Sequence, residues 1–192
     1  MKYLGIFFAL LALALAPQAA SVAARPAAAQ PAGRVLLTSA EALELAFPKC
    51  EIQRSTVYLT KEQRAQAEKL AGFEVKGLAR PYVATKDGKV VGTAYFDSHR
   101  VRTLKESIMI VVGTDGAIQR IEVLAFGEPL DYLPGAKWYA QFKGKVLNDD
   151  LRLRKGIRAV TGATLTAQAT TDSARRILAV HQVLAAAATP AK

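Results

Sequence analysis

Two short turn signals constrain this chain more than any other feature, because each separates two runs of strand-forming residues. The signals are Asp87-Gly88-Lys89 and Thr114-Asp115-Gly116. The flanking runs are 82–84 and 90–96 for the first turn, and 107–112 and 118–124 for the second. Asp-Gly pairs favour the tight turns of antiparallel hairpins, whereas a parallel crossover needs about a dozen residues or more. We therefore expect two β-hairpins within an antiparallel sheet.

Helix signals lie on both sides of these hairpins. Thr38 and Thr60 are each followed three residues later by Glu or Gln, which is the capping-box pattern of a helix start. The first helix is short because Pro48 ends it, and the second runs from about residue 61 to 71. The longest helical pattern covers 167–187. The expected fold is α+β, an antiparallel sheet of hairpins flanked by helices.

The N-terminus has the pattern of an export signal. Lys2 precedes an apolar run over 4–16, which is too short to cross a hydrocarbon core of about 30 Å as a helix. Small residues follow it, with Ala-Ala or Ala-x-Ala cleavage sites at several places between Pro17 and Gln30. We interpret 1–30 as a signal peptide and small-residue linker, and 35–188 as a single domain in the periplasm. An uncleaved signal anchor is the alternative.

Composition restricts the chemistry that the chain can carry. A single cysteine, Cys50, excludes an internal disulfide framework, a Cys-x-x-Cys-His haem attachment and a cysteine cluster for zinc or iron and sulfur. Two histidines without clustered carboxylates predict no metal site. The net charge of +10 suits an acidic partner or an anionic surface, and export argues against nucleic acid.

The segment Val160-Thr161-Gly162-Ala163-Thr164-Leu165-Thr166 lies just before the longest helix. Small residues allow a ligand to approach the backbone, and the amides at a helix start favour a phosphate. Thr164 adds a hydroxyl group at this point. On these residues alone, the alternative is that the threonine only caps the helix.

This segment resembles the Ser/Thr-Gly-Ala-Thr signature of the FMN-binding domain family, which includes the G subunit of the Rnf electron-transport complex and the C subunit of the sodium-pumping quinone reductase. The similarity runs from about Gly77 to Leu184, because the tetrad follows both hairpins, the Glu128-Pro129 loop and the segment 141–145 in the family's order. In that family a flavin transferase, with FAD as donor, joins FMN through a phosphoester to the threonine that ends the tetrad. The resemblance therefore implies FMN, attached covalently to Thr164.

Other candidate contacts lie outside the tetrad. The loop with Glu128 and Tyr132 is a candidate for the surroundings of the flavin ring, and Trp138 is a candidate for stacking on it. Arg102 is a candidate for the flavin phosphate. The complete predicted cofactor-binding set is Thr161, Gly162, Ala163, Thr164, Leu165, Thr166, Glu128, Tyr132, Trp138 and Arg102. The alternatives are a surface loop for Glu128 and Tyr132, core packing for Trp138, and a solvated turn for Arg102 and its neighbour His99.

Two positions depart from the family's pattern. Arg158 stands where the transferase signature usually has an acidic residue. The loop 127–132 reads Gly-Glu-Pro-Leu-Asp-Tyr, where the membrane-complex subunits have Glu-Thr-Pro-Gly-Leu-Gly. The first departure bears on covalent attachment and the second on contacts to the flavin ring.

The resemblance implies an exported FMN-carrying electron-transfer protein. Its expected partners are redox proteins, such as a membrane electron donor or a cytochrome, and a flavin transferase for maturation. No catalytic residue is predicted, because the sequence has no nucleophile-elbow context and few acid/base candidates. Two alternatives stay open: a cofactor-free exported binding module with a basic docking surface, and a flavin-dependent reductase of ferric iron or another small acceptor.

Overall fold

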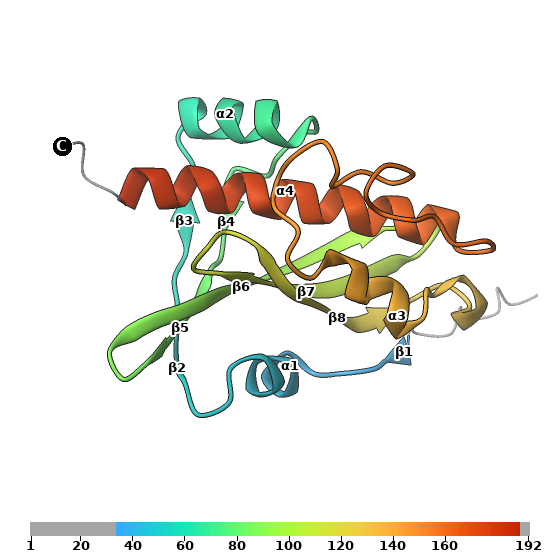
Figure 1. The fold of residues 1–192 in the computed structure, drawn as a ribbon, viewed down its shortest axis with the longest axis horizontal. Helices are drawn as coiled ribbons and strands as arrows, with labels where there is room; N and C mark the ends of the chain where they lie inside the picture. The colour runs from blue at the N-terminus through green and yellow to red at the C-terminus, as the bar shows by residue number, and fades with distance from the viewer. Residues whose placement is uncertain (1–33, 189–192) are drawn as a thin grey trace, which may run out of the picture. The chain divides into compact units, whose positions relative to one another are not determined.

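The computed structural model describes residues 34–188, and its centre is an antiparallel sheet of six strands (Figure 1). The strands are β1 (Arg34–Val35), β2 (Glu51–Arg54), β5 (Tyr82–Lys86), β6 (Lys89–Arg100), β7 (Lys105–Gly113) and β8 (Ile118–Phe126), in the order β1-β8-β7-β6-β5-β2. Helices flank this sheet, so the α+β prediction is confirmed. The predicted signal peptide and linker, 1–30, lie outside the described residues.

Both predicted hairpins are present. Asp87 and Gly88, which join β5 to β6, have φ angles of 51° and 73°, the left-handed conformation that a two-residue hairpin turn requires. Gly116 has a φ of 76° between β7 and β8, and the Asp115 carboxylate accepts a hydrogen bond from the Ala117 amide. The two hairpins join into one sheet, because β6 and β7 pair from Gly92↔Gly113 to Arg100↔Lys105.

A two-stranded ribbon leaves the sheet beside β6. It consists of β3 (Val57–Tyr58) paired with β4 (Leu78–Ala79), which continue the β2 and β5 pair. Pro81 is buried between β4 and β5 and has no N–H group to donate to a neighbouring strand. Accordingly β5 pairs with β6 only as far as Tyr82↔Ala94. The rest of β6, from Tyr95 onward, runs beside the departing ribbon without pairing with it.

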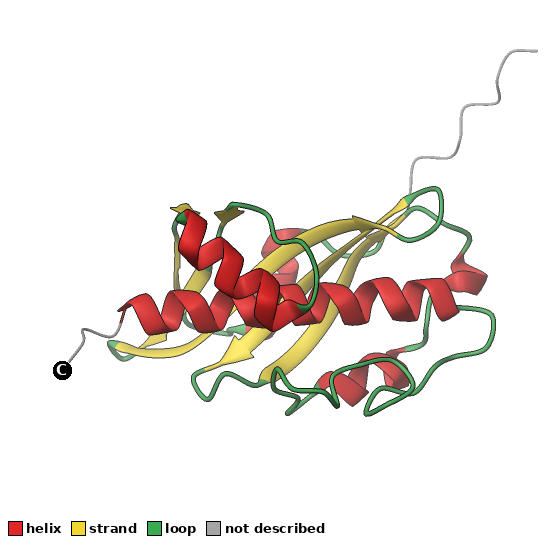
Figure 2. Ribbon diagram, turned by 90° about the horizontal axis from the view of Figure 1, so that it is seen from above, coloured by secondary structure: helices red, strands yellow, loops and turns green. Residues whose placement is uncertain are grey.

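Helices cover both faces of the sheet, and one helix is itself covered (Figures 1 and 2). The helical segments are α1 (Ser39–Ala46), α2 (Lys61–Ala71), η1 (Leu130–Tyr132), α3 (Ala136–Tyr139), η2 (Ala140–Phe142) and α4 (Thr164–Ala188). Helix α1 lies on one face, and α4 lies between the other face and α2. Both predicted capping boxes are formed, at Thr38 and at Thr60. Among residues 34–188, no helix combines the length and the apolar character needed to span a membrane.

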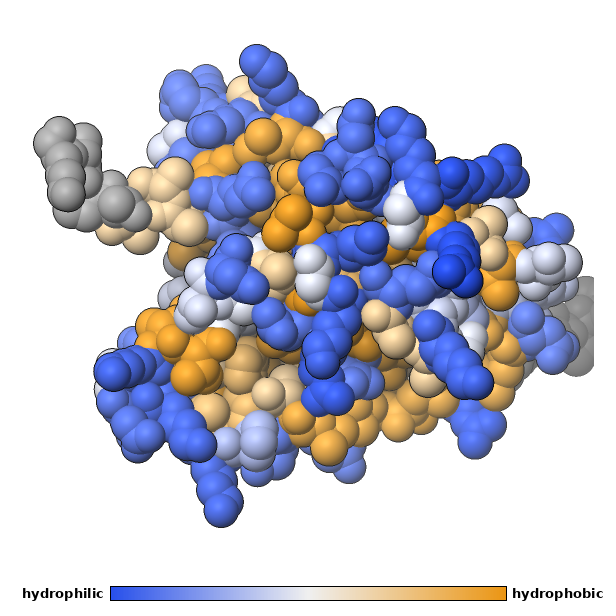
Figure 3. All heavy atoms as spheres, in the orientation of Figure 1, coloured by the Kyte–Doolittle hydropathy of each residue, from blue (hydrophilic) through white to orange (hydrophobic). Residues whose placement is uncertain are grey.

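The sheet is buried on both faces at β7. Ile108, Ile110 and Val112 pack in the cluster that contains α4, whereas Met109 and Val111 pack in the cluster that contains α1. This arrangement explains why β7 is apolar without alternation over 108–112. Hydrophilic side chains cover most of the face shown in Figure 3, with apolar surface exposed between them.

Helix α4 begins at Thr164 rather than at Ala167 as expected from the sequence. The Ala163 carbonyl accepts the hydrogen bond of the Ala167 amide, 2.9 Å, and Gly162 has a φ of 84°, so the chain enters the helix through a left-handed turn. The first turn reads Thr-Leu-Thr, which has no apolar periodicity that would predict a helix. The correction places Thr164 in the first turn of α4.

Close packing of α2 on α4 gives a stability test. Ala67 of α2 is fully buried in a cluster with Ala179, whereas Ala65 of the same helix is exposed. Ala67→Leu is expected to lower the free energy of unfolding by about 1–3 kcal/mol, because the added side chain has no space between the helices. Ala65→Leu should change it by less than about 0.5 kcal/mol. Urea unfolding of both variants measures the difference, and equal effects would contradict this packing.

Candidate functional site

Three loops at one end of β6 and α4 enclose a hollow of about 200 Å³. The loops are the β6–β7 connection, the segment after β8 and the turn before α4. The lining residues are Val101, Arg102, Glu128, Tyr132, Gly162, Ala163, Thr164, Leu165 and Thr166. The fold therefore brings together most of the cofactor-binding residues predicted from the sequence, although they lie far apart in the chain.

Thr164 is half-buried in the wall of the hollow. Its hydroxyl donates a hydrogen bond to the Val160 carbonyl oxygen, 3.3 Å away. A capping threonine would instead accept a hydrogen bond from a backbone amide, as Thr38 and Thr60 do. The donated bond leaves the oxygen lone pairs of Thr164 available. Gly162 leaves the approach open, because a Cβ atom there would meet no atom within 4 Å.

Glu128 holds the β6–β7 connection in place. One of its carboxylate oxygens accepts hydrogen bonds from the amides of Thr103 and Leu104, each 2.7 Å long. The hydrogen bond from the Leu104 amide, followed by that from the Thr103 amide, has the largest effect on Glu128 and holds its pKa below the usual value. Because the carboxylate is occupied by these amides, its role in the structure is to position the loop that carries Arg102. The exposed Arg102 lines the hollow, and its binding of phosphate stays a prediction.

Thr166, in the first turn of α4, ties the helix to the segment that follows β8. Its hydroxyl donates to the Tyr132 carbonyl oxygen at 2.6 Å. The side chains of Tyr132 and Leu165 are 38% and 55% exposed. They therefore present apolar surface to solvent beside the hollow, where a planar ring would find contact.

Two predicted residues lie outside the hollow. Trp138 is buried: its indole N–H donates to the Arg158 carbonyl at 2.6 Å, and its ring packs edge-on against Tyr139 and Phe142. The structure thus places it in the core, as in the alternative that the sequence left open. Thr161 is exposed and does not line the hollow.

A buried polar network lies deeper along α4, and the sequence analysis missed it. Glu106 is fully buried, yet its carboxylate accepts hydrogen bonds from the hydroxyls of Tyr139 and Thr170, both at 2.9 Å. His99 Nε2 lies 2.9 Å from the same carboxylate, and His99 Nδ1 lies 3.1 Å from Asp97. The expected solvated turn at His99 is therefore wrong, because this ring connects two carboxylates inside the fold.

The network perturbs two titrating groups. Burial acts against the charged His99 ring, but hydrogen bonds and charges from Asp97 and Glu106 outweigh it and raise the pKa of His99 to about 9. Burial likewise acts to raise the pKa of Asp97, but hydrogen bonds from His99 and Ser173 and the charge of Lys76 hold it well below its usual range. The charged forms of both groups are therefore favoured.

Spacing contains a signal for this network. His99 on β6 and Glu106 on β7 are cross-strand partners, and Asp97 points to the same face as His99. Thr170 and Ser173, which reach the two carboxylates, share one face of α4. This alternation indicates that Asp97 and Glu106 contact His99 only when the register of β6 and β7 is known.

The described residues contain no group of three or more His, Cys, Asp or Glu side chains arranged to hold a metal ion. Although Asp97, His99 and Glu106 are close together, their polar atoms are engaged by one another and by hydroxyl donors.

The fold and the hollow together define a small α+β domain with a ligand site where its last helix begins. Residues 104–179 match the model of the FMN-binding domain family, and this part of the chain is an FMN-binding domain. The match supports flavin binding by this part of the chain. The match includes Glu128, Tyr132 and the tetrad, whereas Arg102 precedes it. No curated protein matches the chain.

The residues of the hollow fit one part of FMN. A hydroxyl, the amides of a helix start and an arginine suit the phosphate. A space of about 200 Å³ is smaller than the whole cofactor. The exposed Tyr132 and Leu165 would provide apolar contact for the rest of the cofactor, outside the hollow.

The pKa of His99 predicts how stability changes with pH. A raised pKa means that its stabilising contribution is fully present below about pH 6.5 and is lost as the pH rises through about 9. Between these values the free energy of unfolding should fall by about 2–3 kcal/mol more in the wild type than in His99→Gln. Urea unfolding at several pH values measures this difference. An NMR titration of the wild-type ring gives an independent check, and a midpoint near 6.5 would contradict the assignment.

Proposed function

We propose that this chain carries FMN in phosphoester linkage to Thr164 and passes electrons between redox proteins outside the cytoplasm. The observation that carries the proposal is the position of Thr164, a residue with a hydroxyl group that lines the hollow at the start of α4 within the match to the FMN-binding domain family. Residues 1–30, predicted from the sequence to be a signal peptide and linker, support export to the periplasm.

The covalent step makes one phosphoester bond and breaks one phosphoanhydride bond. The Thr164 oxygen attacks the phosphorus of the FMN half of FAD, AMP leaves, and the hydroxyl proton is released. A flavin transferase catalyses this exchange. Arg102 and the amides at the start of α4 are the groups that would hold the phosphate once it is attached.

The surroundings of the hollow favour an electron carrier over an enzyme with its own substrate. When bound, FMN accepts and donates one or two electrons, and the protein has only to orient it. Glu128 is engaged with two backbone amides and is not free to act as an acid or base. Tyr132 and Leu165 are exposed, so a ring beside them is accessible to another protein. A membrane donor and a cytochrome are the proposed partners.

Two alternatives predict different behaviour. A cofactor-free binding module is disfavoured by the FMN-binding domain over 104–179. A reductase of ferric iron or another small acceptor would use the same flavin. The rates at which reduced protein transfers electrons to a cytochrome and to a ferric chelate distinguish this reductase from an electron carrier.

Thr164→Val tests the covalent linkage. Wild-type chain produced together with a flavin transferase should show a fluorescent band after denaturing electrophoresis. The variant should lose the band completely, because valine has no oxygen to form the ester. Thr56→Val, an exposed threonine between β2 and β3, is the matched control and should keep full fluorescence. A fluorescent Thr164→Val band would move the attachment to another residue.

Arg102→Ala tests the phosphate contact separately. In the Thr164→Val background, where binding is non-covalent, this change should weaken FMN about tenfold, because it removes a charge-assisted hydrogen bond. Riboflavin, which lacks the phosphate, should bind both forms equally. Flavin-fluorescence titration measures the two affinities, with Lys89→Ala as a charge control far from the hollow. An equal loss for riboflavin would contradict the phosphate role.

A further inference from the structure

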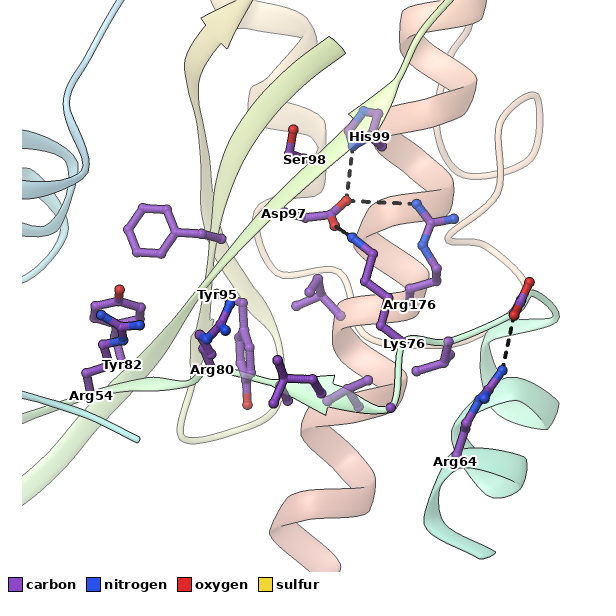
Figure 4. A pocket seen from close by; sticks show the side chains of 18 of the residues that line it. Arg54, Arg64, Lys76, Arg80, Tyr82, Tyr95, Asp97, Ser98, His99 and Arg176 are labelled. Atoms are coloured by element: carbon purple, nitrogen blue, oxygen red, sulfur yellow. Dashed lines mark hydrogen bonds and ion pairs between the residues drawn. The ribbon is translucent and has the colours of Figure 1, made fainter. Parts of the chain in front are cut away.

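A second and larger cleft, of about 940 Å³, lies beside β6 (Figure 4). One wall is the part of β6 from Tyr95 to His99, and the other is the ribbon segment from Lys76 to Arg80. Arg176 and Val180 of α4 contribute to its lining. The cleft shares no lining residue with the flavin hollow.

The wall formed by β6 is an unpaired sheet edge. Strand β5 reaches only Ala94 of β6, whereas β6 continues to Arg100 and pairs on its other side with β7. Pro81 turns the chain away at this point, and within residues 34–188 no other strand pairs with this stretch. Alternate N–H and C=O groups of Tyr95–Arg100 therefore point toward the cleft without a strand partner.

Cations surround this edge. Figure 4 shows Arg54 and Tyr82 on one side of β6, and Lys76 and Arg176 on the other. The Arg54 guanidinium lies 5.8 Å from the centre of the Tyr82 ring. Lys76 and Arg176 share one carboxylate, Asp97, at 3.3 and 3.9 Å. The cleft thus holds more positive than negative charge.

Two cations that line the cleft, Arg54 and Arg80, are available to an incoming ligand. Within the described part of the chain, neither Arg54 nor Arg80 forms an ion pair, and both are exposed. Arg64, by contrast, is held by Glu68 and Glu74. Cations beside a sheet edge exclude neutral apolar and basic strands, which protects the protein against aggregation, but they attract an acidic strand.

We propose that an extended acidic segment of a partner protein binds in this cleft by adding a strand to the open edge of β6. The backbone of Tyr95–Arg100 supplies hydrogen bonds over about 20 Å, and the cations select carboxylate side chains on both faces of the added strand. The site goes beyond flavin binding and does not require the cofactor. It assigns a surface for protein recognition to a stretch of β6 that shares no lining residue with the flavin hollow.

The direct test is binding of a fluorescein-labelled peptide, acetyl-Glu-Glu-Val-Val-Glu-Glu-amide, to the full chain by fluorescence anisotropy; as a strand, this peptide carries Glu on both faces. Saturable binding is expected. A peptide with Lys in place of each Glu should bind at least tenfold more weakly. A peptide with alternate backbone amides methylated should also lose at least tenfold, because methylation removes the strand hydrogen bonds and leaves the charge unchanged.

Variants and hydrogen exchange locate the site. The double change Arg54→Ala with Arg80→Ala should weaken the acidic peptide about tenfold, whereas Lys89→Ala, which removes an exposed charge outside the cleft, should have little effect. Alternate amides within 95–100 should exchange more slowly when the peptide is bound. FMN loading of each variant is the control for folding. A variant that loses loading but keeps peptide binding has a defect in the flavin site and an intact cleft.

Four results would overturn the proposal. Equal binding of the methylated peptide would mean attraction by charge without strand addition, and equal binding of the lysine peptide would remove the selection for acidic segments. A lack of binding at millimolar peptide would mean that the edge does not bind acidic segments. A dimer whose 95–100 amides are protected, and which the peptide does not dissociate, would mean that a second copy of the chain covers the edge.

Discussion

Polar contacts along α4 fix its position in addition to the apolar packing of its buried face. Three hydroxyls on one face of the helix, from Thr166, Thr170 and Ser173, donate to the Tyr132 carbonyl, Glu106 and Asp97. These residues are spaced so that they fall on successive turns of one helix face. On the α2 side, the buried Arg175 donates to the carbonyls of Ala71, Asn148 and Leu151. A hydrogen bond has strict geometry, so these contacts fix the rotation and the axial position of α4 together.

This constraint is what makes a site at the helix start possible. Thr164 precedes the Thr166 contact by half a turn, so its hydroxyl is held relative to the loop that carries Tyr132. Glu128 fixes the opposite loop through the amides of Thr103 and Leu104. The loops that line the hollow are therefore not independent: each is tied to the sheet or to α4. A cofactor bound among them would be oriented by groups whose own hydrogen bonds are already satisfied.

The sequence predicted those parts of the structure that have local causes. Both hairpins follow from Asp-Gly turns, and two helix starts follow from capping boxes, because each signal is complete within a few residues. The short strands β1 to β4 were not predicted, since two to four residues carry too little periodicity. His99 was misplaced for a related reason: one of its partners, Glu106, comes from the neighbouring strand β7, and this pairing depends on the register of the two strands. The tetrad was found because its residues are contiguous, whereas Trp138 was assigned by residue type, which does not distinguish a ring that contacts a ligand from one in the core.

The length of β6 connects the cleft and the hollow, because its second half lines the first and the connection that follows it lines the second. Had β5 followed β6 to its end, the edge at Tyr95–Arg100 would be covered and no cleft would exist there. Pro81 prevents this, and the ribbon turns away. The same extended half of β6 still needs burial on one face, and it obtains this from Asp97 and His99, which join it to α4 and β7. Beyond His99, the strand ends in the connection that carries Arg102 to the hollow. The buried charges therefore support a strand that is unpaired on one edge, and by holding that strand they also hold one wall of the flavin site.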